Sequence, residues 1–356
     1  MNNSVNNILG QGTLNQDIHK SKTVDLLLQP IYEFLYRDGV DEITINKPNE
    51  IWLKYGYKWK REDIKFDEKD YEHLVNAICA FNGIKVQANL SVILPKGERC
   101  QITHRQAVIE GQMSFNIRKH STKVYSLDDL NEQGSFDNWR DVSFNKDLNE
   151  KTQKYLELLD PEDLELINLK QNGDILGFLK KIITSEKNII VAGKTGSGKT
   201  TFARGLIGEI PEDKRIITIE DVHELHLPNH PNHLHMMFGE GTGRMNATEA
   251  LKACMRLSPD RILLAEIRGN EAYEFLNSMN TGHAGGITTV HSNNALSCFD
   301  RIATLIKNSE VGRSLDLSSI MMSLNTSIDV ILFFKERKLT EVYFDPIRKL
   351  QKSLME

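Results

Sequence analysis

The first third of the chain alternates between helical and strand-like spacing of its apolar residues. Residues 1–21 are polar and carry no apolar period, so this segment is predicted to be a flexible N-terminus. Apolar residues then recur every three to four positions over 24–36 and again over 67–81, which predicts two amphipathic helices. The second helix should end at Asn82 and Gly83, because glycine accepts the left-handed conformation that closes many helices. We therefore expect an α+β domain over residues 22–130. Strand-like alternation marks 42–46, 51–54, 90–94, 99–103 and 112–118.

The rest of the chain has a different pattern. Residues 131–162 are polar and weakly periodic, which predicts a linker, whereas apolar runs alternate with helical segments over 163–356. Short runs rich in β-branched residues are typical of parallel strands that are buried on both faces. The second region is therefore predicted to be a doubly wound α/β domain. Its helices are expected at 174–184 and 199–208, and its strands at 188–192, 215–219, 261–265, 287–291, 328–334 and 339–344.

Composition narrows the classes of function. The chain has 356 residues and a net charge of −5, which disfavours a protein that works by coating nucleic acid. Its apolar runs are no longer than a strand, and its start lacks an apolar stretch after basic residues. Neither a membrane-spanning helix nor a signal peptide is therefore predicted. The scattered cysteines form no Cys-x-x-Cys pair, which disfavours a zinc ribbon and favours reduced thiols. They are Cys79, Cys100, Cys254 and Cys298.

A phosphate-binding loop is the strongest motif. Residues 193–200 read Gly-Lys-Thr-Gly-Ser-Gly-Lys-Thr and match G-x-x-x-x-G-K-[ST] at every fixed position. The motif follows an apolar strand and opens a helix, so backbone N–H groups can converge on phosphate oxygens. Lys199 is expected to reach the β- and γ-phosphates of ATP, and Thr200 to bind Mg²⁺. A chance glycine-rich turn is the alternative, which the flanking strand and helix disfavour. The expected nucleotide contacts are Gly193, Lys194, Thr195, Gly196, Ser197, Gly198, Lys199, Thr200 and Thr201.

Carboxylates follow two of the predicted strands. An ATPase needs one carboxylate near Mg²⁺ and another that orients the attacking water. Glu266 ends an apolar strand and is the candidate general base, with Glu220 and Glu224 as further catalytic candidates. The alternative is that these carboxylates cap the next helix or pair with Arg268. The candidate ligands of Mg²⁺ are Thr200, Glu220 and Asp221.

A third segment, residues 282–291, combines glycines with two histidines. The glycines permit close approach of the backbone to a ligand. His283 is therefore a candidate nucleotide contact, and His291 a candidate catalytic side chain. A purely structural histidine is the alternative for both.

The order of these motifs resembles the secretion ATPase superfamily. The phosphate loop is followed by segments similar to that superfamily's Asp box, its atypical Walker B motif ending in Glu, and its His box. Within the superfamily the chain resembles the type IV secretion traffic ATPases over roughly residues 24–335. The matching segments are 193–200, 219–225, 259–269 and 282–291, and in the N-terminal domain 42–48, 94–99 and 114–119.

The resemblance implies a RecA-like P-loop core with a separate N-terminal α+β domain, assembled into a homo-hexameric ring. It implies that nucleotide lies between the two domains, with Arg99 and Arg118 at the phosphates. A plain surface role is the alternative for each arginine. It further implies a cytoplasmic ATPase, peripheral at the inner membrane through secretion-system components that include other ATPases. Such an enzyme would power pilus assembly or the transfer of DNA or protein cargo, which it meets only indirectly.

Two other functions stay open. The type II secretion ATPases carry a four-cysteine zinc site that this chain lacks, but a type IV pilus retraction ATPase has a similar length. A nucleotide-switched scaffold or nucleic-acid-binding module, with incidental turnover, is the second alternative. Whether Glu266 is required separates this scaffold from a motor.

Five of the eleven histidines fall within residues 223–235. Such a run invites a metal-binding hypothesis, but the spacing is not H-E-x-x-H. Pro228 and Pro231 instead favour a solvated loop. The histidines are His223, His226, His230, His233 and His235.

Overall fold

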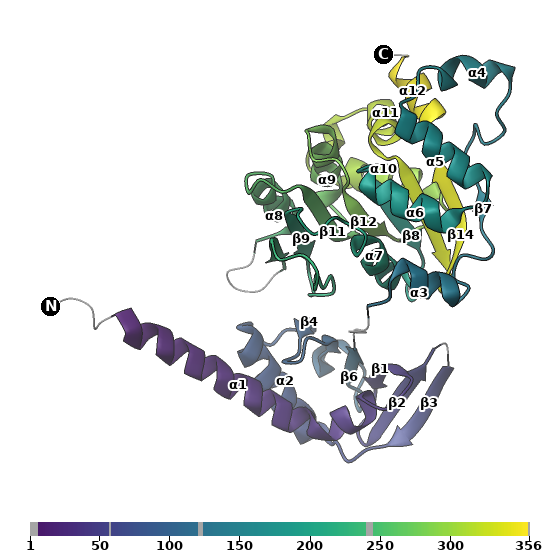
Figure 1. The fold of residues 1–356 in the computed structure, drawn as a ribbon. Coiled ribbons are helices and arrows are strands. Elements are labelled where there is room, and N and C mark those ends of the chain that lie inside the picture. Colours follow the sequence, from purple (N-terminus) through teal and green to yellow (C-terminus); the bar gives the residue numbers. More distant parts are fainter. Residues whose placement is uncertain (1–5, 57, 120–123, 240–244, 355–356) are drawn as a thin grey trace. The chain divides into compact units, whose positions relative to one another are not determined.

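The computed structural model describes residues 6–56, 58–119, 124–239 and 245–354 and divides into two compact units (Figure 1). The first unit comprises the described residues before 122 and holds a six-stranded antiparallel sheet in the order β3-β2-β1-β6-β5-β4. Its strands are β1 (Val40–Ile45), β2 (Glu50–Tyr55), β3 (Lys58–Asp63), β4 (Asn89–Ile93), β5 (Arg99–Thr103) and β6 (Ser114–Arg118).

Helices α1 (Asn6–Leu35) and α2 (Glu68–Asn82) contribute to one apolar core with the first sheet. The alternation of the strands explains this core, because Ile43 and Ile45 are buried while the alternating Glu42 and Thr44 are not. Helix α2 begins with a capping box at Asp67 and ends at Gly83, whose φ of 66° is left-handed. The predicted end of this helix is therefore confirmed.

Two elements of the first unit differ from expectation. Helix α1 starts at Asn6 instead of near residue 24, so residues 6–21 are helical where a flexible segment was expected, and residues 1–5 lie outside the described part. Polar residues do not prevent a helix, but they provide no apolar period by which its start could be recognised. Strand β3 was also missed as a separate strand, because five of its six residues are exposed and no alternation marks it.

The second unit contains an eight-stranded sheet in the order β10-β9-β11-β12-β8-β13-β14-β7. Strands β10 to β13 along this order are parallel, and β14 runs antiparallel to β13. The strands are β7 (Arg140–Asp141), β8 (Ile189–Gly193), β9 (Ile216–Glu220), β10 (His233–Met237), β11 (Arg261–Ile267), β12 (Ile287–Val290), β13 (Val330–Lys335) and β14 (Lys338–Phe344).

Helices cover both faces of this sheet, as the doubly wound prediction required (Figure 1). Alternate residues of β8 enter different cores: Ile189 packs with one set of helices and Ile190 with the other. The first face carries α3 (Leu127–Glu132), α5 (Pro161–Gln171), α6 (Ile175–Thr184) and α7 (Lys199–Ile207). The second carries α8 (Ala247–Cys254), α9 (Glu271–Asn280), α10 (Ser297–Asn308) and α11 (Leu317–Ser327). The remaining helices are α4 (Glu150–Leu156) and α12 (Pro346–Ser353).

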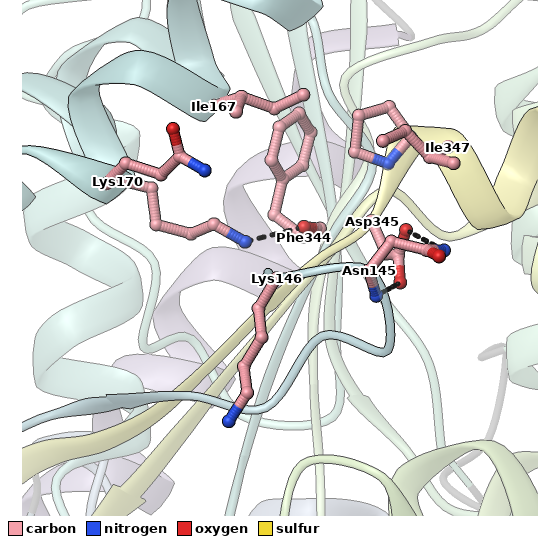
Figure 2. A pocket seen from close by; sticks show the side chains of 9 residues that line it. Asn145, Lys146, Ile167, Lys170, Phe344, Asp345 and Ile347 are labelled. Atoms are coloured by element: carbon pink, nitrogen blue, oxygen red, sulfur yellow. Dashed lines mark hydrogen bonds between the residues drawn. The ribbon is translucent and has the colours of Figure 1, made fainter. Parts of the chain in front are cut away.

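Residues 131–162, expected to be a linker, instead belong to the second unit. Strand β7 lies within them and pairs with β14 at the edge of the sheet. The buried Lys170 fixes this segment. Its Nζ donates to Phe344 O at 2.7 Å (Figure 2). The same Nζ lies 2.8 Å from Asp141 Oδ2. The cavity beside Lys170 measures about 10 Å³, room for no more than a water molecule. A two-residue strand held by polar contacts leaves no periodic signal in the sequence.

Candidate functional site

The phosphate loop connects the buried strand β8 to helix α7. Gly196 and Gly198 have φ of 76° and 97°, a left-handed backbone that a side chain disfavours. The loop tip at Lys194 and Thr195 is exposed, whereas Ser197 and Lys199 are buried. The sequence folds this way because the turn must reverse the chain from the end of a strand into the start of a helix.

The turn between β13 and β14 supports the loop, which the motif alone did not predict. The backbone N–H of Arg337 donates to Ser197 O at 2.9 Å. Arg337 also lies against Gly198, where an added Cβ would come within 3.4 Å of the Arg337 Cα. Both Glu336 and Arg337 adopt positive φ, as the type I′ two-residue hairpin turn requires. The sequence pattern predicted a hairpin over these two strands. It did not predict that the turn of the hairpin contacts the phosphate loop.

The ammonium group of Lys199 is the centre of the site. It donates to the carbonyl oxygens of Gly193 at 2.9 Å and Lys194 at 3.0 Å. It also lies 3.4 Å from Nδ1 of His291, which follows the neighbouring strand β12. Because an ammonium group only donates, Nδ1 of His291 must accept.

His291 connects the loop lysine to the candidate base. Its other ring nitrogen, Nε2, lies 2.7 Å from Glu266 Oε1 at the end of β11. With Nδ1 accepting from Lys199, Nε2 carries the proton and donates to the Glu266 carboxylate. The three side chains come from β8–α7, β12 and β11, which are adjacent at the carboxyl edge of the sheet. The structure therefore brings Lys199, His291 and Glu266 together.

Arg268 extends this series of contacts. Its guanidinium donates twice to Glu266 Oε2, at 2.6 and 2.9 Å, and once to Asp221 Oδ2 at 2.6 Å. Burial alone would raise the pKa of Glu266, but the hydrogen bond from His291 and the charge of Arg268 lower it to about 2. Glu266 therefore stays ionised. From the sequence, an ion pair between Glu266 and Arg268 was the alternative to a catalytic role for Glu266. In the structure, Glu266 makes this ion pair and also contacts His291.

Replacing Arg268 should lower turnover more than nucleotide affinity. We expect Arg268→Gln to reduce kcat between about tenfold and a hundredfold, because Glu266 loses the fork that holds it in place. KM for ATP should change little, since the phosphate loop is untouched. Arg268→Lys restores charge without the planar fork and should recover part of kcat. Steady-state hydrolysis with the exposed Arg301→Gln as control checks this, and an unchanged kcat in Arg268→Gln would contradict a positioning role.

Glu220 and Glu224 lie farther along the sheet. Strand β9, which ends at Glu220, is separated from β8 by β11 and β12. Both carboxylate oxygens of Glu220 are engaged locally: Oε2 accepts from the backbone N–H groups of Glu224 and Leu225, each at 2.7 Å. The expected role of Glu220 in binding Mg²⁺ or assisting catalysis is therefore not supported by its placement. Sequence order could not show this, because it does not reveal how many strands separate two strand ends.

Arg204 on α7 is a residue that sequence reasoning missed. Its Nε donates to the carbonyl oxygen of Glu224 at 2.6 Å, although the side chain is buried. Burial lowers the pKa of this guanidinium, and the nearby Glu224 and Glu220 charges act in the opposite direction. Arg204 thus ties the segment after β9 to the helix that begins at the phosphate loop.

His283 lies at the other end of its strand. It precedes β12, and β12 runs parallel to β8 with Ile287 opposite Ile189. A residue before β12 therefore lies at the amino edge of the sheet, whereas the phosphate loop lies at the carboxyl edge. The structure does not support the expected nucleotide contact of His283 within one chain. Only His291, after the strand, reaches the loop.

Arg99 and Arg118 lie in the first unit. They are directly opposite each other on the antiparallel strands β5 and β6, so their side chains share one face of the sheet. Glu42 of β1 is opposite Arg118 on the same face. The sequence suggested both arginines separately, and the register now makes them a pair.

Comparison with known proteins identifies the family of the chain. The model of the family described as type II/IV secretion system protein matches residues 153–338, more than half of the chain. The type IV secretion system protein VirB11 of Brucella suis is 36% identical over 355 residues, which cover 95% of this chain and 94% of that protein. The crystal structure of the Brucella suis VirB11 ATPase in complex with sulphate matches with a TM-score of 0.52 and 33% identity. It covers 96% of this chain and 99% of that one.

A more distant match concerns the fold alone. The pilus retraction motor PilT with bound ADP has a TM-score of 0.56 at 17% identity, over 93% of this chain and 87% of that one. Within the parts of the chain that the structure describes, no helix is both long and apolar enough to cross a bilayer. The family match and the identity across nearly the whole chain show that this protein belongs to the type II/IV secretion system protein family, as a type IV secretion ATPase.

Proposed function

We propose that the protein couples ATP hydrolysis to substrate transfer or pilus assembly in a type IV secretion system. The observation that carries this proposal is the continuous series of contacts from Lys199 through His291 to Glu266. It joins the phosphate loop to a carboxylate, as hydrolysis requires and binding alone does not. Substrate transfer by cells whose only copy of the protein carries Glu266→Gln tests the proposal.

The phosphate loop supplies the nucleotide contacts in this proposal. On binding ATP, the Lys199 ammonium would exchange the carbonyl oxygens of Gly193 and Lys194 for oxygens of the β- and γ-phosphates. Thr200 and Thr201 occupy the next two positions of α7. A threonine hydroxyl and a carboxylate supply oxygen ligands of the kind that Mg²⁺ prefers, so Thr200 and Asp221 remain the candidate ligands of the ion. Mg²⁺ neutralises charge that develops on the phosphates.

Glu266 is proposed to orient the attacking water. Its carboxylate is kept ionised by Arg268 and by the hydrogen bond from the Nε2–H group of His291, so it is available as an acceptor for the attacking water. Glu224 remains a further candidate, because Arg204 fixes its segment to α7. Glu220 is not retained in this role, since its carboxylate is engaged by its own segment.

Arg99 and Arg118 are proposed to bind phosphate from the first unit. Like charges placed directly opposite on neighbouring strands repel each other, so the pair favours a shared anionic partner. Glu42 contributes negative charge beside Arg118, but its carboxylate also binds Lys54 at 3.0 Å and Asn116 at 3.0 Å. Arginine suits the charge that grows on a γ-phosphate.

The proposed assembly is a closed homo-hexameric ring. Head-to-tail contacts between identical chains close into a ring when the rotation permits. We expect light scattering in the presence of an ATP analogue and Mg²⁺ to give about six times the mass of the single chain. A strict monomer at micromolar concentration under these conditions would refute the ring.

The proposed setting is the cytoplasmic face of the inner membrane, reached through other secretion-system components, with DNA or protein cargo handled indirectly. A pilus retraction ATPase is the less supported alternative, since the similarity to that motor is one of fold. A nucleotide-switched scaffold would need no hydrolysis. It therefore gives no reason for the contacts that join Glu266 to the phosphate loop.

A further inference from the structure

A cluster of histidines lies at the opposite side of the second sheet from β7. The sequence favoured a solvated loop for this segment, but His233 and His235 belong to the edge strand β10. Strand β10 pairs in parallel with β9, and the register places His235 opposite Thr218. His223 follows β9 directly. The fold therefore collects histidines from both sides of one loop near the end of β9.

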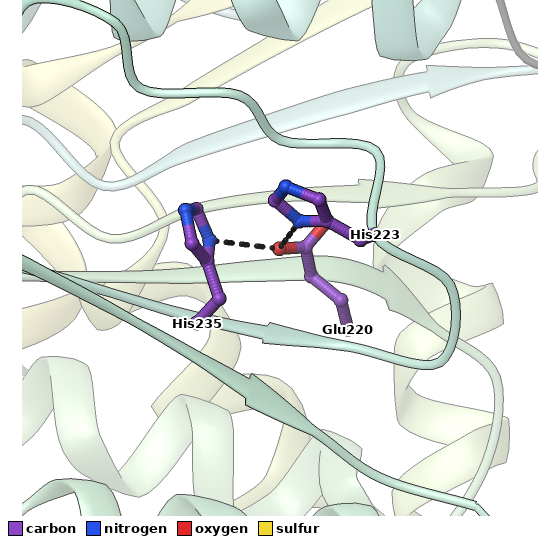
Figure 3. A group of neighbouring side chains, drawn as sticks. All are labelled: Glu220, His223 and His235. Atoms are coloured by element: carbon purple, nitrogen blue, oxygen red, sulfur yellow. Dashed lines mark hydrogen bonds and ion pairs between the residues drawn. The ribbon is translucent and has the colours of Figure 1, made fainter. Parts of the chain in front are cut away.

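Two of these imidazoles converge on one carboxylate (Figure 3). Nδ1 of His223 lies 3.3 Å from Glu220 Oε1, and Nδ1 of His235 lies 3.2 Å from the same oxygen. The three atoms all lie within 4.8 Å of one another. In tetrahedral zinc sites with bonds of about 2.0–2.1 Å, neighbouring ligand atoms are about 3.3 Å apart. The two nitrogen-to-oxygen distances match this spacing, and all three ligand atoms lie close enough together to face one ion.

Thr218 belongs to the same cluster of polar contacts. Its hydroxyl lies 2.6 Å from Glu220 Oε1 and 2.7 Å from Nδ1 of His235. Glu220 Oε1 therefore has the Thr218 hydroxyl and both imidazoles as neighbours. A cation shared by the carboxylate and two unprotonated imidazole nitrogens would take the place of the protons between them.

Surrounding groups hold the three side chains as metal sites require. Nε2 of His223 lies 3.1 Å from Nδ1 of His226, so its second nitrogen has a partner. Glu220 Oε2 accepts from the backbone N–H groups of Glu224 and Leu225, each at 2.7 Å, and these bonds hold the carboxylate in place. The carboxylate of Glu220 is fully buried, while the side chains of His223 and His235 are 43% and 21% exposed, which leaves a path for an ion to enter.

We propose that Glu220, His223 and His235 form a binding site for a divalent transition-metal ion of the zinc class. Two imidazole nitrogens and one carboxylate oxygen are ligands typical of Zn²⁺, and the fourth position is left for water. The site is separate from the Mg²⁺–ATP site, because β11 and β12 lie between β9 and β8. A bound ion would fasten the segment after β9 to the edge strand β10. Asp221 and Glu224 lie on that segment, so the ion would stabilise the part of the sheet edge that contacts Arg268 and Arg204.

Metal binding by the purified full-length protein tests this proposal directly. After chelation and in the presence of excess Mg²⁺ without nucleotide, Co²⁺ serves as a coloured probe for Zn²⁺. We expect a single equivalent of Co²⁺ to give visible absorption bands of tetrahedral coordination, which Zn²⁺ then abolishes. Zn²⁺ should also raise the melting temperature, because it binds only the folded chain.

Variants make the result specific to the three ligands. His223→Ala with His235→Ala should remove the tetrahedral bands and the Zn²⁺-dependent rise in Tm, while circular dichroism shows a folded protein. His73→Ala, an exposed histidine on α2, is the matched control and should bind as the wild type does. Wild-type protein without tetrahedral bands, or a double variant that keeps them, would overturn the proposal. Because neither readout involves ATP, its failure leaves the proposed ATPase function unaffected.

Discussion

Lys199→Ala should abolish ATP turnover and weaken nucleotide binding. The substitution removes the ammonium group that donates to two carbonyl oxygens of the phosphate loop. Losing one preorganised charge at a transferred phosphate costs about 10²–10³ in kcat. Losing a charge-assisted hydrogen bond, worth about 1.5–3 kcal/mol, should weaken ATP binding about tenfold to a hundredfold.

Steady-state hydrolysis and binding of a fluorescent nucleotide check this prediction. Lys65→Ala, an exposed lysine of the first unit, is the control for loss of a positive charge. Thermal unfolding of both variants separates a catalytic effect from lost stability, since Lys199 is buried. Normal turnover in Lys199→Ala would remove the basis for the whole site.

Glu266→Gln should separate binding from hydrolysis. Glutamine keeps the size of the side chain and one acceptor oxygen, but it loses the negative charge that His291 and Arg268 contact. ATP binding relies on the loop, Lys199 and Mg²⁺, so it should persist. Turnover should fall by roughly a hundredfold or more, the usual contribution of a positioned general base.

The measurement is single-turnover hydrolysis alongside equilibrium ATP binding in one preparation. Glu310→Gln, an exposed carboxylate on the same unit, controls for the change in net charge. Hydrolysis at nearly the wild-type rate would show that Glu266 is not the catalytic carboxylate. Glu224 would be the next candidate.

The phosphate loop and the buried strands could be predicted because their signals are local. A glycine pattern between an apolar strand and a helix leaves little freedom, and the resemblance to secretion ATPases drawn from four ordered motifs is confirmed by the family match. Strands β8, β9, β11 and β12 lie within two residues of their expected bounds at each end. Buried parallel strands can be recognised in a sequence as short apolar runs.

The arrangement of side chains around the loop could not be predicted in the same way. The order of the strands in the sheet decides which strand ends lie next to each other. This order could not be predicted from the sequence. Because β12 lies between β8 and β11, His291 can contact both Lys199 and Glu266, while Glu220 is carried away with β9. His283 was assigned by its place in a motif, but strand direction puts it at the other edge.

Segments held in place by polar contacts were also difficult to predict from the sequence. Strand β7 and the contacts of Lys170 hold residues 140–146 on the second unit through hydrogen bonds, which leave no hydrophobic period. The histidine cluster is a similar case. Its prolines favoured a loop, while the parallel pairing of β10 with β9 brings His235 next to Glu220.

Substrate transfer by cells that carry only the Glu266→Gln protein tests the central claim most directly. The protein level and nucleotide binding are measured in the same cells' extracts, so that transfer is compared at equal amounts of folded protein. If hydrolysis powers transfer, the variant binds ATP and supports no transfer above the level of cells lacking the protein. Transfer at the wild-type level, with hydrolysis lost, would contradict the motor and establish a scaffold that is switched by nucleotide binding alone.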